Sequence, residues 1–262
     1  MTNAALHVAR TGLDAEQNRM RVIANNISNV NTTGFKRDRA NFETLAYQSI
    51  TQPGATSSGD DKYTQGLSLG SGVQMTGTSR SDTQGSPQQT GNALDLAIQG
   101  AGFFQIQQPD GTIAYTRDGN FSLSAEGQIS TAEGRPLIPN ISVPDGSTNI
   151  TIGADGTVSA MAAGATTSTQ LGKIQLVSFV NPTGLSEIGN NLLTETDASG
   201  TPQIGDPGTD GRGSVTQGSL ESSNVDVTEE LVDMIETQRA YEVNSKMIKA
   251  ADDMMQFANQ NM

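Results

Sequence analysis

The chain has 262 residues, a formal net charge of −13, one histidine, and no cysteine or tryptophan. Without cysteine it has no disulfide framework, thiol nucleophile or zinc–thiolate site, and a single histidine excludes a multi-histidine metal site. So acidic a chain lacks the basic face that nucleic-acid binders need. We therefore expect no cofactor and no nucleic-acid partner, and we expect His7 to be exposed or to lie at an interface.

The first residues, MTNAALHVARTGLDAEQNRM, lack the unbroken apolar segment and the small-residue cleavage site of a secretory signal. No apolar run in the sequence approaches the roughly 18 to 20 residues of a membrane span, so we expect no membrane insertion. The protein is expected either to stay in the cytosol or to leave the cell by a route that needs no cleaved signal.

Residues 1–30 have the apolar spacing of one long helix. Apolar positions repeat every seven residues, with a second set three positions further on, which is the pattern of a coiled-coil seam. The main set is Leu6, Leu13, Met20 and Ile27. Most stripes of this kind pack against a protein's own core, so burial within the chain is the alternative to an interface with other copies.

The sequence ANNISNVNTTGFKR at 24–37 follows this helix. Asn and Thr side chains bond to nearby backbone groups and favour helix ends, and Asn tolerates the left-handed conformation that ends helices. The residues of this predicted corner are Asn25, Asn26, Asn29, Asn31, Gly34 and Phe35. We expect the two adjacent asparagines to stay helical, the next three residues of the set to unwind the chain, and the phenylalanine to anchor it again.

Residues 31–91 are rich in Gln, Ser, Thr and Gly over much of their length, which predicts loops or an extended arm with few core positions. The arm positions that we single out are Tyr47, Gln52, Pro53 and Gly54. The acidic segment GDDKY at 59–63 is a further feature of this arm.

Residues 92–200 carry the signals of strands. Gly111, Gly119 and Gly127 recur every eight residues in turn sequences between short alternating runs, which predicts a β-meander of hairpins. The sequence ADG at 154–156 predicts another hairpin, and LGKIQLVSFV at 171–180 is predicted as the longest apolar strand.

Residues 225–262 predict a second long helix, without internal Gly or Pro. Its apolar residues again repeat every seven positions, in a series that begins with Leu220 and continues through Val227, Met234, Tyr241, Ile248, Met255 and Met262. Thr228 is predicted as the N-cap, followed by two glutamates that suit the positive end of the helix dipole. Methionines on such a seam favour an adaptable packing surface.

Charge is distributed unevenly between the two ends. Residues 1–40 hold six Lys and Arg against three Asp and Glu, a net +3, whereas residues 219–262 hold three against nine, a net −6. The two ends should attract each other, and exposed ends should also attract the opposite ends of neighbouring copies. The alternative is that both are solvated helix surfaces with incidental charge.

These elements predict an α+β fold. The long N- and C-terminal helices pair in a coiled-coil-like domain, followed by an extended irregular or β-hairpin arm and an inserted all-β domain. The predicted boundaries are residues 1–30 plus 225–262 for the helical polymerisation domain, 31–91 plus 201–224 for the connecting arm and linker, and 92–200 for the outer β domain.

No catalytic or metal-ligating pattern stands out. The paired acids in the glycine-rich loops near 60 and 206–210 do not fit a twelve-residue calcium loop, and Gly-Ala-Gly at 100–102 precedes a strand instead of the helix of a dinucleotide site. A secreted enzyme with a β catalytic domain that acts on peptidoglycan remains an alternative, because two carboxylates suffice for glycoside hydrolysis. A carbohydrate-binding module is a further alternative.

Five segments resemble bacterial flagellar rod and hook proteins, and together they extend over nearly the whole chain. They are ARTGLDA (9–15), VIANNISNVNTTGFKRDRANFE (22–43), ALDLAIQGAGFFQI (93–106), AYTRDGNFSLSAEGQI (114–129) and GSLESSNVDVTEELVDMIETQRAYEVNSKMIKAADDMM (218–255). Within that family, YQSITQPGATSS (47–58) resembles subunits of the distal part of the rod more than those of the proximal rod or the hook, which remain the alternatives.

The resemblance implies a structural subunit without enzymatic activity. It implies a helical homo-polymer whose terminal helices surround a central export channel, with the β domain outside and the arm stiffening the tube that transmits torque from motor to hook. The implied interface is Leu6, Leu13, Met20, Ile27, Val227, Met234, Tyr241, Ile248 and Met255. The implied location is the rod that crosses the periplasm, reached without a cleaved signal. The implied partners are other copies, proximal rod proteins, the hook protein, the outer peptidoglycan and outer-membrane ring proteins, and the flagellar type III export apparatus.

Overall fold

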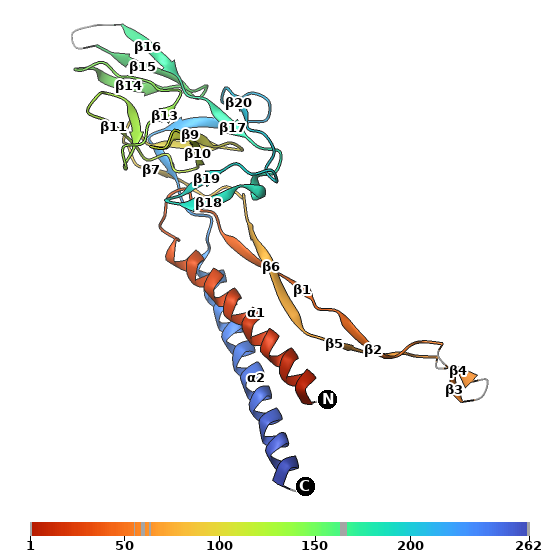
Figure 1. Cartoon of the computed structure of the whole chain (residues 1–262). Helices are drawn as coiled ribbons and strands as arrows, with labels where there is room; N and C mark the ends of the chain where they lie inside the picture. Colours follow the sequence, from red (N-terminus) through yellow and green to blue (C-terminus); the bar gives the residue numbers. More distant parts are fainter. Residues whose placement is uncertain (1, 55, 59–60, 63, 163–166, 261–262) are drawn as a thin grey trace. The chain divides into compact units, whose positions relative to one another are not determined.

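The structure is a computed structural model of the 262-residue chain, and it describes all residues except 1, 55, 59–60, 63, 163–166 and 261–262. The chain divides into two compact units (Figure 1). Unit 1 contains residues 1–28, 38–79 and 226–262, and unit 2 contains residues 29–37 and 80–225. The fold is α+β, as the sequence predicts, with two long terminal helices and antiparallel strands between them.

The helix pair of unit 1 consists of α1 (Thr2–Ser28) and α2 (Val227–Gln260). The helices run antiparallel, because Asn26 of α1 lies beside Glu230 near the start of α2 and Gly12 lies beside Asn244 further along it. Within the described residues, neither helix carries an apolar stretch that could cross a bilayer.

The rest of unit 1 is a two-stranded antiparallel ribbon. Its pairs are β1 (Asp38–Thr44) with β6 (Val73–Arg80), β2 (Tyr47–Thr51) with β5 (Leu67–Gly70), and β3 (Thr56–Ser58) with β4 (Asp61–Lys62). The predicted arm is therefore a β-ribbon over most of its length. Of the acidic segment at 59–63, residues 59–60 and 63 lie outside the described residues.

Unit 2 is built from short strands in several small sheets. The largest sheet has the order β13 (Leu137–Ile138), β9 (Phe104–Gln107), β10 (Ile113–Thr116), β19 (Leu192–Thr194) and β18 (Ser186–Gly189). A second sheet has the order β14 (Thr148–Ile152), β15 (Thr157–Met161) and β16 (Ser168–Lys173). One 3₁₀ turn, η1 (Pro182–Gly184), precedes β18.

Four two-stranded pairs complete unit 2. They are β7 (Pro87–Gln89) with β22 (Ser219–Glu221), β8 (Leu96–Gln99) with β21 (Ser214–Gln217), β11 (Phe121–Leu123) with β12 (Ile129–Thr131), and β17 (Leu176–Ser178) with β20 (Gln203–Gly205). The first two pairs join the start of the β region to its end, so unit 2 is closed by strands far apart in sequence. Leu220, the first member of the predicted C-terminal heptad series, lies in β22 and not in a helix.

The hairpin predictions hold at three of the four glycines. Gly111, Gly127 and Gly156 have positive φ and connect β9 to β10, β11 to β12 and β14 to β15. The prediction at Gly119 is wrong, because β10 pairs with β19 and β11 pairs with β12. Gly119 instead lies against the backbone of Leu96, where an added Cβ would sit 1.6 Å from the carbonyl oxygen.

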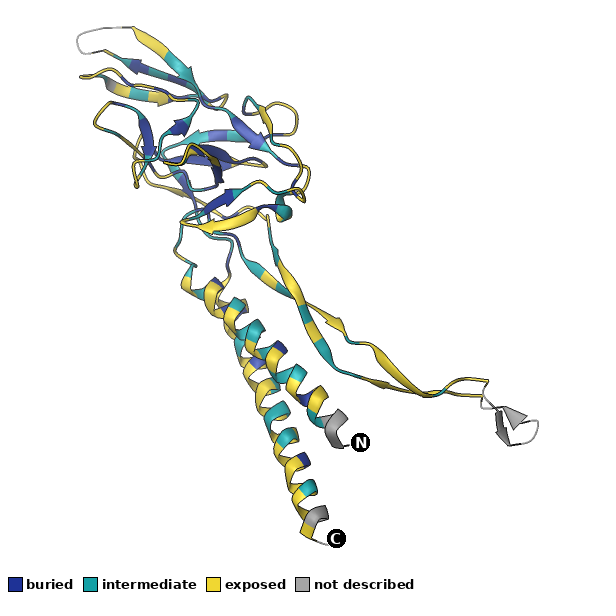
Figure 2. Cartoon of the chain, in the orientation of Figure 1, coloured by how far each residue is buried: buried dark blue, intermediate teal, exposed yellow. Residues whose placement is uncertain are grey.

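The apolar core lies in unit 2, and Figure 2 shows how buried residues gather on its strands. Phe104 and Phe121 are fully buried and meet edge to face, with ring centroids 5.2 Å apart. The predicted strand at 171–180 is divided between β16 and β17, which belong to different sheets. Ile174, between them, is buried, and its amide donates to the carbonyl oxygen of Gly156.

Candidate assembly interface

The seam between the two helices is mixed in polarity. Asn26, Glu230 and Thr237 are buried in the helix pair, together with the apolar residues Ala9, Ala15, Ile23 and Ala251. Asn26 Nδ2 donates to Glu230 Oε2 at 3.2 Å. Gly12 lies close to α2, since an added Cβ would lie 3.0 Å from the side-chain nitrogen Nδ2 of Asn244. Among the described helix residues, Ile23 is the one large apolar side chain classed as buried, so most large apolar side chains of the pair are at least partly exposed.

Two charged residues of α1, Arg19 and Glu16, also bear on how strongly the helices are held together. Arg19 Nη2 lies 3.5 Å from Asp233 Oδ1, which is the attraction between the two ends that their opposite charge predicts. Glu16 is half-buried, and its Oε2 has no hydrogen-bond partner among the described residues. A buried polar atom without a partner weakens a seam, so the pair gains little stability here.

The interface residues predicted from heptad spacing flank this polar seam. Those described as half-buried are Leu6, Leu13, Met20, Ile27, Met234, Ile248 and Met255. Val227 and Tyr241 are exposed, at 40% and 41%. Each of these side chains is thus at least partly exposed, and their role in contacts between copies stays a prediction.

Large apolar side chains lie among charged ones on the exposed surface of α2. Those classed as exposed are Val227, Leu231, Val232, Ile235, Tyr241, Val243, Met247, Met254 and Phe257. We call these residues the outer apolar face of α2. At about 100° per residue, Leu231 and Met247 lie about 160° apart around the helix axis, with Ile235 and Val243 between them. Exposed charged residues such as Arg239 and Lys246 lie in the same sector, so this surface alternates between apolar and charged side chains.

The described part of the ribbon also exposes apolar side chains. Tyr47 is 64% exposed, and Ile50, Leu67 and Leu69 are exposed as well. Gln48 pairs directly with Leu69, so Leu69 lies on the same face of the ribbon as Gln48. Two-stranded ribbons are marginal by themselves, so this surface is a candidate for contact with another element.

The other predicted arm residues form the turn that follows β2. Gln52, Pro53 and Gly54 are exposed, and Gly54 has a φ of +82°. Pro53 lies against the returning strand, where a Cβ added to Gly66 would sit 2.6 Å from Pro53 Cδ. These residues therefore set the path of the chain between β2 and β3.

The chain leaves α1 within the Asn-rich corner, and the anchoring role of Phe35 stays a prediction. Asn25 and Asn26 are helical, α1 ends at Ser28, and residues 29–34 form turns that finish at Gly34 with a φ of +69°. Asn25 and Asn31 are exposed, Asn29 and Phe35 are half-buried, and Asn26 and Gly34 are buried. A Cβ added to Gly34 would lie 2.8 Å from the carbonyl carbon of Arg117, so only glycine fits.

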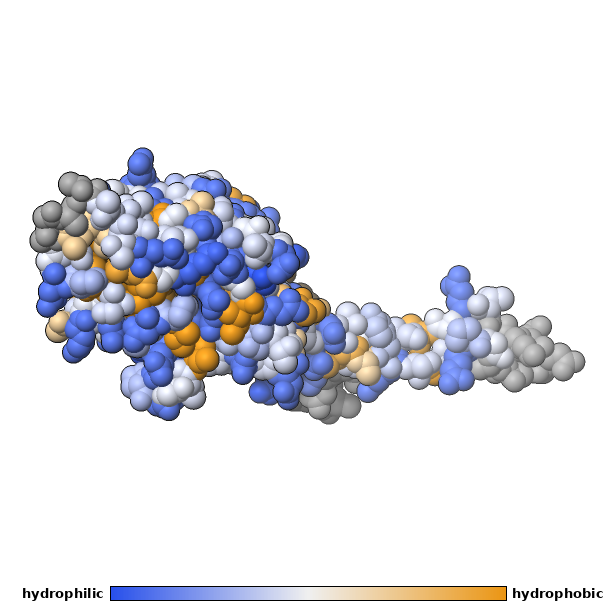
Figure 3. Space-filling model, turned by 90° about the horizontal axis from the view of Figure 1, so that it is seen from above, coloured by the Kyte–Doolittle hydropathy of each residue, from blue (hydrophilic) through white to orange (hydrophobic). Residues whose placement is uncertain are grey.

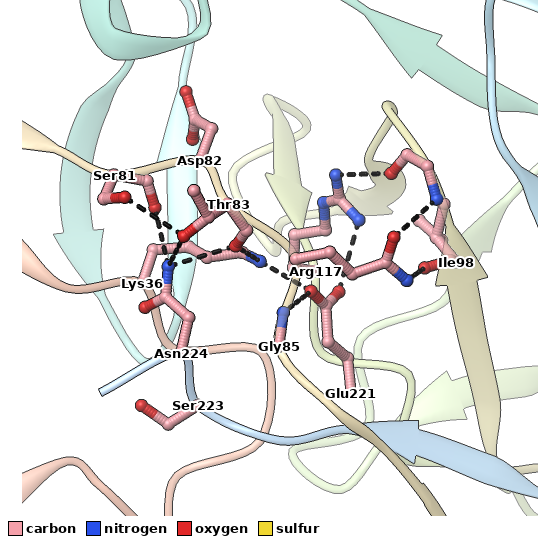
Figure 4. Close-up of polar contacts among 12 residues, drawn as sticks. Lys36, Ser81, Asp82, Thr83, Gly85, Ile98, Arg117, Glu221, Ser223 and Asn224 are labelled. Atoms are coloured by element: carbon pink, nitrogen blue, oxygen red, sulfur yellow. Dashed lines mark hydrogen bonds and ion pairs between the residues drawn. The ribbon is translucent and has the colours of Figure 1, made fainter. Parts of the chain in front are cut away.

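A charged cluster follows this corner in unit 2 (Figure 4). Glu221 Oε1 accepts from Lys36 Nζ at 2.5 Å and from the amide of Gly85 at 3.0 Å, and Glu221 Oε2 accepts from Arg117 Nη1 at 3.2 Å. All three charged side chains are buried. We call Lys36, Arg117 and Glu221 the neck cluster. The cluster joins the segment near residue 36, through which the chain leaves α1, to the segment near residue 221, which precedes α2. We call the latter the exit segment.

Burial works against both cations of the neck cluster. Desolvation lowers the pKa of Lys36 and of Arg117, and the nearby Glu221 carboxylate opposes the shift in each case. Lys36 Nζ also donates to the carbonyl oxygen of Thr83, and Arg117 Nη2 donates to that of Gly100, both at 2.8 Å. Glu221 is bonded to both buried cations and Asp82 adds a weaker attraction to each, so the cluster depends mainly on Glu221.

An asparagine in the exit segment reinforces the same connection. Asn224 Oδ1 accepts from the amide of Arg37 at 2.7 Å, and its Nδ2 donates to the carbonyl oxygens of Ser81 and Thr83. Sequence reasoning missed these residues, because the partners are far apart in the chain and follow no periodic pattern. The only sequence feature that pointed to these contacts was the opposite net charge of residues 1–40 and 219–262.

The start of α2 differs from the prediction. Asp226 is the N-cap, because its Oδ1 accepts from the amides of Thr228 at 2.8 Å and Glu229 at 3.4 Å. Thr228 lies within the first turn, so the prediction that it caps the helix is wrong. Asp226 sits one position before Val227, the first helical residue, where its short carboxylate reaches the free amides.

Unit 2 also has a polar cleft, whose lining includes Asp118, Glu133 and Arg135. Asp118 Oδ1 accepts from the Thr33 hydroxyl at 2.9 Å, and burial raises the pKa of this carboxyl group. Glu133 pairs with Arg135 at 2.8 Å. The two carboxylates are thus held in local structural bonds. Among the described residues, no cluster of three His, Cys, Asp or Glu side chains could hold a metal ion. His7 is exposed.

Three family models match successive parts of the chain. The flagella basal body rod protein model matches residues 6–36, the flagellar hook protein FlgE/F/G D1 domain matches 97–160, and the flagellar basal body rod FlgEFG protein C-terminal model matches 216–261. They coincide with the N-terminal helix and corner, with much of unit 2, and with the last strands and α2.

Relatives match over nearly the whole chain. The flagellar basal-body rod protein FlgG of Buchnera aphidicola subsp. Acyrthosiphon pisum is 50% identical over 256 residues, which cover 98% of each chain. The FlgG of Agrobacterium fabrum is 44% identical over 259 residues, covering 98% of this chain and 99% of the relative. The flagellar hook-basal body complex protein FlhP of Bacillus subtilis is 33% identical over 264 residues, covering 96% of each.

The paired terminal helices, the ribbon and the inserted β unit, together with these matches, define a structural protein of the bacterial flagellar axis. Such proteins are not enzymes. The chain belongs to the FlgG family of flagellar basal-body rod proteins, the structural subunits of the distal rod.

Proposed function

We propose that the chain polymerises through its terminal helices and ribbon into a helical tube, which transmits torque from the motor to the hook and leaves a central export channel. One observation carries this proposal. The outer apolar face of α2 is exposed on several sides in the single chain, while few large apolar side chains are buried in the helix pair. Burial of such a face against other copies would stabilise a polymer strongly.

The proposed division of labour follows the sequence boundaries. Residues 1–30 plus 225–262 form the polymerisation domain, residues 31–91 plus 201–224 connect and brace, and residues 92–200 form the outer β domain. A heterologous contact that repeats without closing yields a helical tube. The proposed contact residues are the outer apolar face together with the heptad positions Leu6, Leu13, Met20, Ile27, Met234, Ile248 and Met255. Tyr47, Gln52, Pro53 and Gly54 supply arm contacts.

The proposed partners are other copies of the chain, proximal rod proteins, the hook protein, the outer peptidoglycan and outer-membrane ring proteins, and the flagellar type III export apparatus. The rod would cross the periplasm, and the chain would reach it without a cleaved signal.

A charge on the outer apolar face tests the polymer. Val243→Asp places a carboxylate where the proposed contact excludes water, and an unpaired buried charge costs several kcal/mol for each subunit. We expect no rods in basal bodies isolated from cells that express this variant, while the secreted or purified chain keeps the circular dichroism of its β unit. Met234 and Ile248 are less suitable positions, because they are already half-buried in the single chain.

The matched control is Val243→Ala, which shortens the same side chain without adding charge and should still form rods. Full-length rods built from the Val243→Asp protein would show that the outer apolar face does not mediate assembly.

A further inference from the structure

The ribbon in unit 1 contacts α1 at two separate places. One contact lies near the C-terminal end of α1 at Asn26, and the other lies towards its N-terminal end at Thr11. Both involve the first strand pair, β1 and β6, or the turn residues directly before β6. The stabilisation of this pair therefore comes partly from the helix and not only from cross-strand bonds.

At the first contact, Asn26 bonds to both backbone groups of one residue. Its Oδ1 accepts from the amide of Asp38 at 3.0 Å, and its Nδ2 donates to the carbonyl oxygen of Asp38 at 2.9 Å. The same Nδ2 donates to Glu230 Oε2 of α2. Only a side-chain amide can donate and accept in this way, and Asn26 is 1% exposed. One buried residue thus joins α1, β1 and α2.

At the second contact, Thr11 receives the start of β6. Its hydroxyl donates to the Val8 carbonyl oxygen at 2.8 Å and accepts from the Val73 amide at 3.4 Å. The approach depends on Gly72, which has a φ of +115°, because an added Cβ would lie 2.1 Å from Thr11 Oγ1. His7 Nδ1 lies 3.3 Å from the Ser71 carbonyl oxygen and adds a third bond.

The two contacts are spaced equally along helix and strand. Thr11 and Asn26 are 15 positions apart in α1, which corresponds to roughly 22 Å. Asp38 and Leu45, whose amide donates to the Gly72 carbonyl oxygen at 2.9 Å, are seven positions apart, which corresponds to roughly 23 Å of strand. The β1–β6 part of the ribbon and α1 therefore run alongside each other between these two contacts (Figure 1).

We infer that β1 and β6 form a strap clamped to α1, and that Asn26 and Thr11 are the positioning residues that hold the ribbon in one direction relative to the helix pair. The strap ends at Gly72, so the ribbon beyond it presents Tyr47, Ile50, Leu67 and Leu69 from a fixed base. The consequence for rod stiffness rests on the proposed function, but the clamp itself is a property of the single chain.

The absence of cysteine allows a direct test on the full chain. Spin labels are attached at Gln17→Cys in α1 and Gln48→Cys in β2, which are both exposed positions, and the distance distribution is measured by double electron–electron resonance. We expect a single narrow distribution in the parent. Asn26→Leu and Thr11→Val should each about double its width, because each removes one of the two fixed points.

Two controls separate release of the strap from general unfolding. Asn31→Ser alters an exposed asparagine outside both contacts and should leave the distribution unchanged. A second label pair, Gln17→Cys with Lys246→Cys, measures the distance between the helices. Thr11→Val lies far from Glu230, so it should widen the ribbon distribution and leave the helix–helix distribution narrow.

The inference is overturned if the parent's ribbon distribution is broad, or if both variants keep the parent's width. A broad helix–helix distribution in the parent also overturns it, because the strap would then have no ordered helix to hold. These outcomes are independent of the Val243→Asp result. A failed clamp leaves polymerisation intact as a proposal, and rods from Val243→Asp cells leave the clamp untouched.

Discussion

The helix pair and the β unit have opposite distributions of polarity. In unit 2 the side chains of Phe104, Ile106 and Leu137 are fully buried, and the surface seen from above in Figure 3 has separate apolar areas between polar ones. In the helix pair the seam holds Asn26 and Glu230 beside Ile23, and most large apolar residues are at least partly exposed. A unit that hides its apolar surface offers little of it to a partner, whereas a unit that exposes apolar side chains has surface left for contacts with neighbours. The two units thus differ in how much apolar surface the proposed assembly could still bury.

The largest predicted change in the free energy of unfolding comes from a substitution in the neck cluster of unit 2. Glu221→Gln removes the carboxylate that is bonded to both Lys36 and Arg117 and leaves both cations buried. Breaking a buried ion pair costs about 3–5 kcal/mol, and we expect a loss of that size in the free energy of unfolding of unit 2, measured by urea denaturation of the purified chain.

The matched control for this prediction is Glu187→Gln. The Glu187 side chain is 55% exposed and lies 4.0 Å from Arg80, so the change should stay within about 0.5 kcal/mol. Equal effects from the two substitutions would mean that the neck cluster is not buried in solution.

The next effect compares one residue type in the two units. Ile106→Ala opens a cavity in the core of unit 2, where Ile106 is 0% exposed, and should cost about 2–5 kcal/mol. Ile235→Ala removes the same atoms from α2, where Ile235 is 50% exposed, and should change the unassembled chain by less than about 0.5 kcal/mol. Thermal and urea unfolding of the purified variants measures both. Comparable losses would show that α2 already packs its outer face within a single chain.

The smallest effect concerns the pH dependence of unit 2. Burial raises the pKa of Asp118, so the folded state binds that proton more tightly than the unfolded state does. The resulting stability is fully present below the unfolded pKa and is lost as pH rises through the folded pKa. Asp118→Asn cannot ionise, so its stability relative to the parent should rise between acidic and neutral pH.

Asp110→Asn is the control for the sign of this effect. Bonds from the hydroxyl and amide of Thr112 lower the pKa of Asp110, so its contribution is present at neutral pH and lost as pH falls through the folded pKa. Its stability relative to the parent should therefore fall over the same rise in pH. Parallel slopes for the two variants, measured by urea unfolding at several pH values, would contradict the assignment.

The terminal helices and the corner could be predicted because their signals are local. A seven-residue apolar repeat and an Asn-rich stretch each encode structure over a few turns, and α1, α2 and the positive φ of Gly34 follow them. The turns at Gly111, Gly127 and Gly156 are local in the same sense. The sequence around Gly119 carries a similar turn signal, but the strand that pairs with β10 on the side away from β9 is β19, which lies far along the chain.

The candidate site could be predicted only in part. Heptad spacing selects apolar residues, whereas the positions fully buried between the helices include Glu230 and Thr237, which are polar and also seven apart. The neck cluster and the Asn26 contact with Asp38 depend on specific polar partners, which no periodicity encodes. The opposite charge of the two ends predicted attraction, and both Arg19 with Asp233 and Lys36 with Glu221 realise it.

The long span of the neck bonds has a consequence for folding kinetics. Lys36 and Glu221 are 185 positions apart, and Arg37 and Asn224 are 187 apart. Contacts of such separation form only after a large loop has closed, and proteins dominated by them fold slowly. A chain that emerges or refolds from its N-terminal end holds Lys36 without its counter-charge until almost all of unit 2 is present. The bonds of Lys36 with Glu221 and of Arg37 with Asn224 are therefore expected to form among the last steps of folding, when the rest of unit 2 is already folded.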